Sequence, residues 1–234
     1  MKNSKEYGQK LQKLYRGLKR AHSKKIDHVV FDDPIEALIS GIVGEHCTEA
    51  ATTRAMKGFR ETFVDWNDLR VSRVEEIVEV LREDNTTSRT AAFSLITALR
   101  AIFDEYHTLS LLPLKKIGKR PAKQALESLE GVGHFVVSYC MLTALQGHAI
   151  PLTETMASYL RQNEVVDPGA DAHDIEGFLT RQVAAKNAYE FYSLLRQESE
   201  SAKPAKKKTT RAKKKTTTRT KKTTKKRKVV KAKK

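Results

Sequence analysis

The sequence predicts an all-α fold followed by a disordered basic tail. Apolar residues recur at intervals of three and four in one segment after another, which is the spacing of one face of a helix. Residues that cap helices, such as Asp, Thr and Ser, precede many of these segments. No segment forms a convincing strand pattern, so we expect residues 1–200 to contain helices alone.

Charge is divided sharply along the chain. The 234 residues carry a net charge of +16, but residues 202–234 contain 18 Lys and Arg and no Asp or Glu. The other 26 basic residues face 28 acidic ones, so the first part of the chain is nearly neutral. A segment of Lys, Arg, Thr and Ala without aromatic residues cannot bury enough surface to offset its ordering entropy. We expect residues 201–234 to be disordered alone.

Composition argues against several classes of protein. Cys47 and Cys140 are the only cysteines, and they form no CxxC motif and no zinc or iron–sulfur spacing. We therefore expect buried free thiols in a reducing, intracellular compartment, with no metal and no cofactor. The polar N-terminus lacks the apolar core of a signal peptide, and no apolar run is long enough to predict a membrane span.

The first helix is predicted over residues 5–21, with an apolar face and a basic outer face. It belongs to an N-terminal element, residues 1–28, that we expect to pack on the core. Asp32-Asp33-Pro34 is a start signal for the next helix. That helix is apolar on nearly all sides, which indicates a central place in the core. Its apolar residues are Ile35, Leu38, Ile39, Ile42 and Val43.

Capping patterns predict the following helices. Thr48 is expected to cap a helix that ends near Phe63, and residues 66–69 to form a short turn. Ser72-Arg73-Val74-Glu75 has the pattern of a capping box for a helix ending near Leu81. Thr87 or Ser88 is expected to cap a long helix that ends near Tyr106. The residues that this long helix is expected to bury are Phe93, Ile96, Leu99, Ile102 and Phe103.

The last third of the chain repeats this pattern. Residues 109–119 are expected to be irregular, and a short helix is predicted from Pro121 to Leu129. An apolar helix is predicted from His134 to a stop at Gly147, and Thr153 is expected to cap the next helix. Two further helices, over 171–183 and 186–197, complete the predicted fold.

Residues 129–133, Leu-Glu-Gly-Val-Gly, form a two-glycine hairpin between helices. Glycine accepts positive φ angles and lets a backbone approach another group closely. Free amides at the start of a helix form an anion site, and we predict that the anion is a nucleic-acid phosphate. The contact residues would be Gly131, Val132, Gly133 and His134. In the alternative, the glycines only turn the chain between packed helices.

The order of these motifs resembles the endonuclease III branch of the helix-hairpin-helix (HhH-GPD) DNA glycosylases. The hairpin is similar to the family's Leu-Pro-Gly-Val-Gly, with Glu130 in place of proline. The segment from Leu38 to Glu49 resembles the family's apolar helix ending in a Ser-Ala-Gln-Ala-Thr-Asp loop. The resemblance implies a glycosylase-type helical domain over residues 29–200 and a role in base-excision repair on double-stranded DNA.

The resemblance fails at the catalytic positions. The family's lysine and aspartate fall on Phe135 and Thr153, so neither a Schiff base nor a carboxylate is provided there. Glu154 is a weak candidate for a displaced acid, and otherwise a first-turn acid favoured by the helix dipole. The cysteines of the family's 4Fe-4S cluster are missing after the last helix, so no cluster is expected. His46 takes the place of a glutamine that fills the gap left by a flipped base, or is simply a polar loop residue.

The tail is expected to supply most of the affinity for DNA, because Lys and Arg that neutralise phosphates release counterions. Its lysine clusters resemble the tails of linker histones and bacterial nucleoid proteins. The DNA-binding residues predicted in the tail are Lys206, Lys207, Lys208, Lys213, Lys214, Lys215, Lys225, Lys226, Arg227 and Lys228.

Three functions follow from these features. The first is a DNA-binding protein on a glycosylase scaffold that has lost catalysis. The second is a divergent glycosylase or abasic-site lyase that uses Glu154, His134 or a lysine such as Lys119. The third is an interaction module that its tail localises to DNA. We favour the first, and with it a DNA-associated location in a nucleoid, in the cytoplasm or, for a eukaryotic host, in a nucleus. The oligomeric state does not follow from the sequence.

Overall fold

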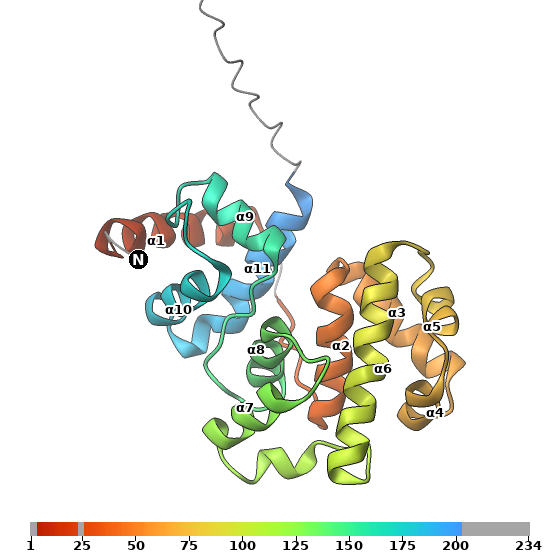
Figure 1. Ribbon diagram of the computed structural model, residues 1–234. Coiled ribbons are helices and arrows are strands. Elements are labelled where there is room, and N and C mark those ends of the chain that lie inside the picture. Colours follow the sequence, from red (N-terminus) through yellow and green to blue (C-terminus); the bar gives the residue numbers. More distant parts are fainter. Residues whose placement is uncertain (1–3, 23–25, 203–234) are drawn as a thin grey trace, which may run out of the picture. The chain divides into compact units, whose positions relative to one another are not determined.

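The computed structural model describes residues 4–22 and 26–202, and these residues form helices and no β-strand (Figure 1). The prediction of an all-α fold is confirmed for this part of the chain. The predicted tail lysines and arginines lie outside the described residues. The helices are α1 (Ser4–Ala21), α2 (Pro34–His46), α3 (Glu49–Thr62), α4 (Trp66–Val71), α5 (Val74–Leu81), α6 (Thr86–Tyr106), α7 (Lys119–Ser128), α8 (His134–Thr143), α9 (Glu154–Gln162), α10 (Ala172–Gln182) and α11 (Ala188–Ser201), with 3-10 helices η1 (Leu112–Lys115) and η2 (Ala185–Asn187).

Helix α2 lies at the centre of the core, as its apolar sequence predicted. It contacts α3, α6 and α8, and its side chains from Ile35 to Val43 are almost all buried. Asp33 starts the helix by accepting a hydrogen bond from the Ile35 amide at 3.0 Å. The same carboxylate accepts the Leu111 amide at 3.0 Å and the Ser110 hydroxyl at 2.6 Å. One cap therefore also anchors the connection that follows α6.

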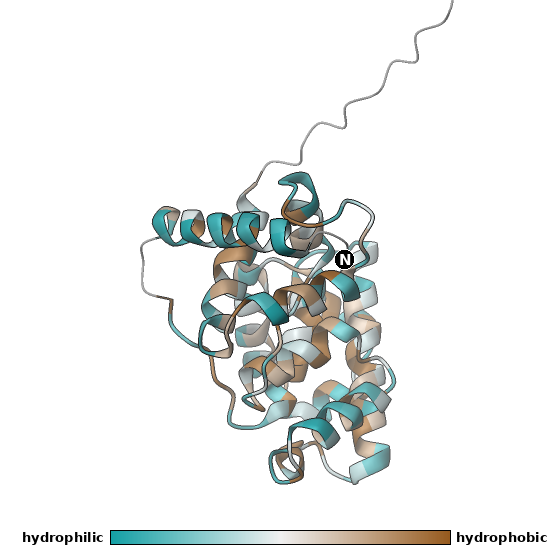
Figure 2. Cartoon of the chain, turned by 90° about the vertical axis from the view of Figure 1, so that its left-hand side faces the viewer, coloured by the Kyte–Doolittle hydropathy of each residue, from teal (hydrophilic) through white to brown (hydrophobic). Residues whose placement is uncertain are grey.

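The helices form two groups that meet at α8. Helices α3 to α6 pack around α2 on one side, and α1, α9 and α10 gather with α11 on the other (Figure 1). Helix α8 contacts α2, α7 and α11, so it joins the groups. Hydrophobic residues lie mainly on the inward sides of the helices (Figure 2). None of the helices that the structure describes has the length and hydropathy of a membrane span.

Several predicted boundaries differ from the structure. Residues 66–71 form helix α4 rather than a turn, and Ser72 ends that helix by donating to the Asp68 carbonyl. The start of α5 is therefore one residue later than predicted, with Arg73 as N-cap and Glu76 accepting its amide at 3.0 Å. The predicted caps of α6 are replaced by Asn85, which accepts the Ser88 amide.

The boundaries in the last third also shift. Helix α7 begins at Lys119 after Gly118, α8 ends at Thr143, and α11 continues to Ser201. Thr153 caps α9 as predicted, by accepting the Met156 amide at 3.3 Å.

Three predictions of burial were wrong. Phe103 of α6 is only partly buried, with the Arg70 guanidinium 4.1 Å from its ring centroid. Phe93 is 66% exposed, because α6 turns that position away from the helices that cover its other side. Cys47 is only partly buried at the end of α2, whereas Cys140 is fully buried in α8. Burial raises the pKa of both thiols above the ordinary value, so neither is an activated thiolate.

Candidate nucleic-acid interface

The hairpin between α7 and α8 is held against the backbone of α6. Gly131 has a φ of +81°, which favours glycine. A Cβ atom at this position would lie 2.8 Å from the Ser94 carbonyl oxygen and 3.0 Å from the Ala98 nitrogen. Gly131 is therefore required both by its backbone conformation and by the close approach of α6.

Gly133 has a different role, because its backbone is extended and suits any residue. It is the N-cap of α8 and provides no side chain to the first amides of that helix. Within the described residues, no acceptor pairs with the amides of His134 and Phe135. The Val132 amide, in contrast, donates to the Leu129 carbonyl at 3.3 Å. The free amides and the helix dipole favour an anion at the start of α8.

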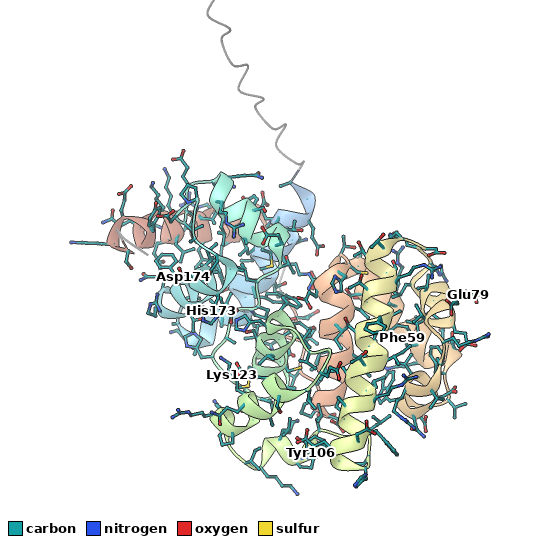
Figure 3. All side chains as sticks on the ribbon, in the orientation of Figure 1. Phe59, Glu79, Tyr106, Lys123, His173 and Asp174 are labelled. Carbon is teal, nitrogen blue, oxygen red and sulfur yellow. The ribbon has the colours of Figure 1, made fainter. Side chains whose placement is uncertain are left out.

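The His134 side chain is tied to α10. Its Nε2 lies 2.7 Å from Oε2 of Glu176, and the Ser138 hydroxyl donates to Oε1 of the same carboxylate at 2.5 Å. Hydrogen bonding to Glu176 raises the pKa of His134 above the ordinary value, and burial and Lys123 oppose this shift. His173 stacks edgewise on His134 at 5.1 Å between ring centroids. Figure 3 shows His173 and Lys123 on the neighbouring helices α10 and α7. A positive imidazolium is thus favoured next to the free amides.

We expect the charge on His134 to stabilise the fold more at low pH. Because the folded pKa is raised above the unfolded value of about 6.5, the contribution is complete below that value and is lost as the pH rises through the folded pKa. The substitution His134→Gln keeps an N–H donor for Glu176 but removes the titration. The difference in unfolding free energy between wild type and this variant, measured in urea, should be larger at pH 5.5 than at pH 8.5. Equal differences at the two pH values would contradict the ion pair.

Glu45, near the end of α2, places its carboxylate next to the hairpin. The sequence analysis had not indicated this residue. A Cβ atom on Gly133 would lie 3.1 Å from Oε2 of Glu45. Burial raises the pKa of Glu45 above the ordinary value, and the nearby His46 and His134 act in the opposite direction. His46, a predicted DNA-binding residue, is the last residue of α2 rather than part of a loop, and it is half-buried. Glu45, His46 and His134 therefore meet at one place.

A buried arginine fixes this end of α2. Arg196 of α11 donates from Nη2 to the carbonyls of Gly44 at 2.9 Å and Cys47 at 2.8 Å. Its Nη1 donates to the Tyr192 hydroxyl at 2.7 Å. Because Arg196 satisfies carbonyls on both sides of Glu45 and His46, it positions these residues relative to the hairpin.

An aromatic cavity of about 310 Å³ lies one helical turn along α8 from Phe135. Tyr139 of α8 and two tyrosines of α11 form much of its wall, and Ser40, Glu49 and Arg196 add polar groups. Tyr139 stacks on Phe135 with centroids 6.0 Å apart and packs edgewise on Tyr192 at the same distance. Burial raises the pKa of Tyr189 to about 12, so this tyrosine stays protonated at neutral pH. The volume is at the lower end of the range of ligand pockets.

The other candidate catalytic residues do not gather at this place. Phe135 is buried and carries no amine, and the hydroxyl of Thr153 is used as the cap of α9. Glu154 is 72% exposed, and its Oε1 lies 2.7 Å from Nη1 of Arg161. Lys119 lines a shallow cavity with residues 144–146, which follow the far end of α8. The length of α8 places that end about 15 Å from the hairpin.

The predicted contact residues are thus partly brought together. Gly131, Val132, Gly133 and His134 are adjacent in the hairpin, and His46 follows Glu45, whose carboxylate lies next to Gly133. The structure also adds Lys123 and Glu176. Lys123 could have been found from sequence as one of five basic residues between 115 and 123, just before the hairpin. No sequence signal distinguished Glu45 or Glu176 from ordinary helix surface acids.

No family model and no curated protein matches the sequence. Solved structures, however, match most of the chain. A trapped covalent intermediate of endonuclease III with DNA aligns with a TM-score of 0.62 at 15% identity, covering 80% of this chain and 84% of that one. An 8-oxoguanine glycosylase/lyase of Clostridium acetobutylicum in complex with DNA gives 0.61 at 17% identity, covering 83% and 70%. A 3-methyladenine DNA glycosylase of H. pylori gives 0.60 at 12% identity, covering 83% and 99%.

These similarities are not confined to a single hairpin, since each covers at least 80% of this chain. The described residues reproduce the arrangement that the resemblance implied, with the hairpin before α8, the apolar α2 beside it and a helix cap at Thr153. The chain therefore has the fold of the endonuclease III-like helix-hairpin-helix DNA glycosylases.

Proposed function

We propose that this chain is a DNA-binding protein on a base-excision-repair scaffold and that it lacks the usual glycosylase and lyase chemistry. The main support is Phe135, whose buried ring occupies the second position of α8 beside the hairpin. The resemblance implies an amine at this place. A phenyl ring can form no Schiff base with an abasic sugar, whereas the free amides of α8 remain suited to a phosphate.

The first residues of α8 would bind the phosphate groups of the DNA. The amides of His134 and Phe135 provide donors for one strand, and positive charge comes from the nearby Lys123 and from the His134 ring, whose protonated form Glu176 favours. Such contacts position a duplex without reading its sequence. The tail would add a strong salt-dependent attraction, because each neutralised phosphate contributes a slope of about −0.9 to the plot of log affinity against log salt.

The residues present do not fit an iron–sulfur cluster. A 4Fe-4S cluster takes four cysteine thiolates, but the chain has two cysteines, and one of these is buried within α8. We therefore propose that the protein binds double-stranded DNA without a cofactor. DNA as the partner also implies an intracellular compartment.

Glu45 supports a second candidate function, a divergent glycosylase. Its carboxyl group lies beside the hairpin, and burial raises its pKa. A carboxyl group whose pKa is raised by burial gives up its proton less readily to water and is better suited to donate it to a leaving base. The aromatic cavity beyond Phe135 would then hold the base that leaves.

We expect no product from duplexes that carry an oxidised pyrimidine or an abasic site. The protein should shift these duplexes in a gel but give neither free base, nor a nicked strand, nor a covalent adduct after borohydride. A borohydride adduct would refute the loss of lyase chemistry. Base release that disappears in Glu45→Gln, with duplex binding retained, would establish the second function in place of the first.

A further inference from the structure

Helix α1 carries an unusual share of the positive charge of the folded part. Residues 4–21 contain six Lys and Arg and one acidic residue, a net charge of +5. Residues 22–201 contain 19 basic and 27 acidic residues, a net charge of −8. The hairpin and the tail do not account for this concentration of charge, because α1 belongs to neither.

The unpaired cations of α1 lie on one line. At about 100° per residue, Lys5, Lys13, Arg16 and Arg20 fall within a sector of about 80°. All four are exposed. We call these four residues the basic stripe. The helix has one acid, Glu6, which lies outside the sector and pairs with Lys10 at 3.1 Å. Lys19 pairs with Glu190 at 2.6 Å, so the cations off the stripe are the ones that have partners within the fold.

The opposite face of α1 is fixed to the fold. Leu11 and Leu18 are buried, and the Tyr15 ring packs edgewise on Phe191 of α11 at 5.3 Å. A helix that binds a membrane surface inserts its apolar face into the lipid, but this face is covered by α11. The stripe can therefore act only as a charged surface.

The stripe and the hairpin lie on different sides of the molecule. The hairpin packs on the backbone of α6 and beside Glu45 of α2. Helix α1 lies across α10 and α11 from α2 and α6 (Figure 1), and the stripe points away from α11. A duplex held by the amides of α8 would thus leave the stripe free.

Like charges three and four residues apart, such as Lys13, Arg16 and Arg20, destabilise an isolated helix. Among the described residues, no acidic side chain pairs with them. A linear polyanion would neutralise them together, and the stripe is about 22 Å long, enough to follow several phosphates of one duplex.

We propose that the basic stripe of α1 binds the phosphate backbone of a second duplex, so that one molecule bridges two DNA segments. The inference rests on the proposed function in one respect, that DNA is the partner. It adds a second binding surface on another face and assigns it to α1.

The test uses the full chain, an immobilised duplex and a fluorescent duplex that is captured only when bridged. The test variant is Lys13→Glu with Arg16→Glu. The matched control, Arg54→Glu with Lys57→Glu, changes the net charge equally at two exposed positions with the same spacing on α3, a helix that packs on α2 and α5. We expect the test variant to capture about tenfold less second duplex than the control and to lower the salt slope of capture by about 2. Both variants should shift a single short duplex equally.

Equal capture by the two variants would overturn the inference, because it would assign bridging to the tail or to no surface of the fold. Far-UV circular dichroism of each variant verifies that α1 remains helical. If the wild type fails to shift even a single duplex, the proposed function fails as well. If it shifts single duplexes and the variants bridge alike, only the role of the stripe is refuted.

Discussion

Replacement of Gly131 by alanine is expected to destabilise the fold by about 2–5 kcal/mol. The φ of +81° is unfavourable for alanine, and the new Cβ would lie 2.8 Å from the Ser94 carbonyl and 3.0 Å from the Ala98 nitrogen. Both atoms belong to the backbone of α6, so they cannot move aside as a flexible side chain would. Urea unfolding followed by far-UV circular dichroism measures the change.

The control is Gly17→Ala, in the interior of α1. This glycine has a helical backbone, and a Cβ there would meet no atom within 4 Å. Alanine should therefore stabilise the fold by up to about 1 kcal/mol. If Gly131→Ala were neutral or stabilising, as Gly17→Ala is expected to be, the close contact of the hairpin with α6 would be refuted.

Replacement of Gly133 by aspartate is expected to weaken duplex binding by roughly tenfold or more, without loss of the fold. Aspartate is a favourable N-cap residue, and the extended backbone of Gly133 accepts it. Its carboxylate would bind the same amides of α8 that a phosphate needs, so the loss of a charge-assisted hydrogen bond corresponds to about this factor. The new cap stabilises the helix, whereas the like charge of Glu45, whose Oε2 would lie 3.1 Å from the new Cβ, opposes it, so the unfolding free energy should change by no more than about 2 kcal/mol.

Binding is measured on a chain that ends at Glu200, so that the tail does not hide the effect. The described residues up to 202 belong to one compact unit, so the shortened chain keeps nearly all of that unit. The control, Gly133→Ala, places only a methyl group near the movable end of Glu45 and should bind as the wild type does. Unchanged binding by the aspartate variant would refute the proposal that the amides of α8 bind phosphate. A shortened chain that prefers no DNA structure would favour the interaction module instead.

Much of the fold follows from local patterns. The caps at Asp33, Thr48 and Thr153 were predicted because each uses hydrogen bonds within three residues. Phe93 was misplaced because helical spacing indicates which residues share a face, but not how far the neighbouring helices cover that face. The start of α5 shifted by one residue because Ser72 already serves as the end of α4.

The candidate site was only half predictable. The hairpin stood out because two glycines before an apolar helix are rare outside special turns. Glu45 and Glu176 did not stand out, because an acid on a helix gives no local sign of what it faces. They reach the hairpin from helices about 90 residues before it and 40 residues after it in the sequence.

The sequence by itself determined the succession of helices, the hairpin and the absence of an amine at Phe135, since these depend on residue type and on contacts a few positions apart. Tertiary structure alone decided that Gly131 packs against the backbone of α6 and that Glu45 and His134 lie close to each other near Gly133. It also decided that the basic stripe of α1 and the hairpin lie on different sides of the molecule. These features depend on how the helices pack, and packing is set by the fit of buried surfaces over the whole core rather than by any one segment.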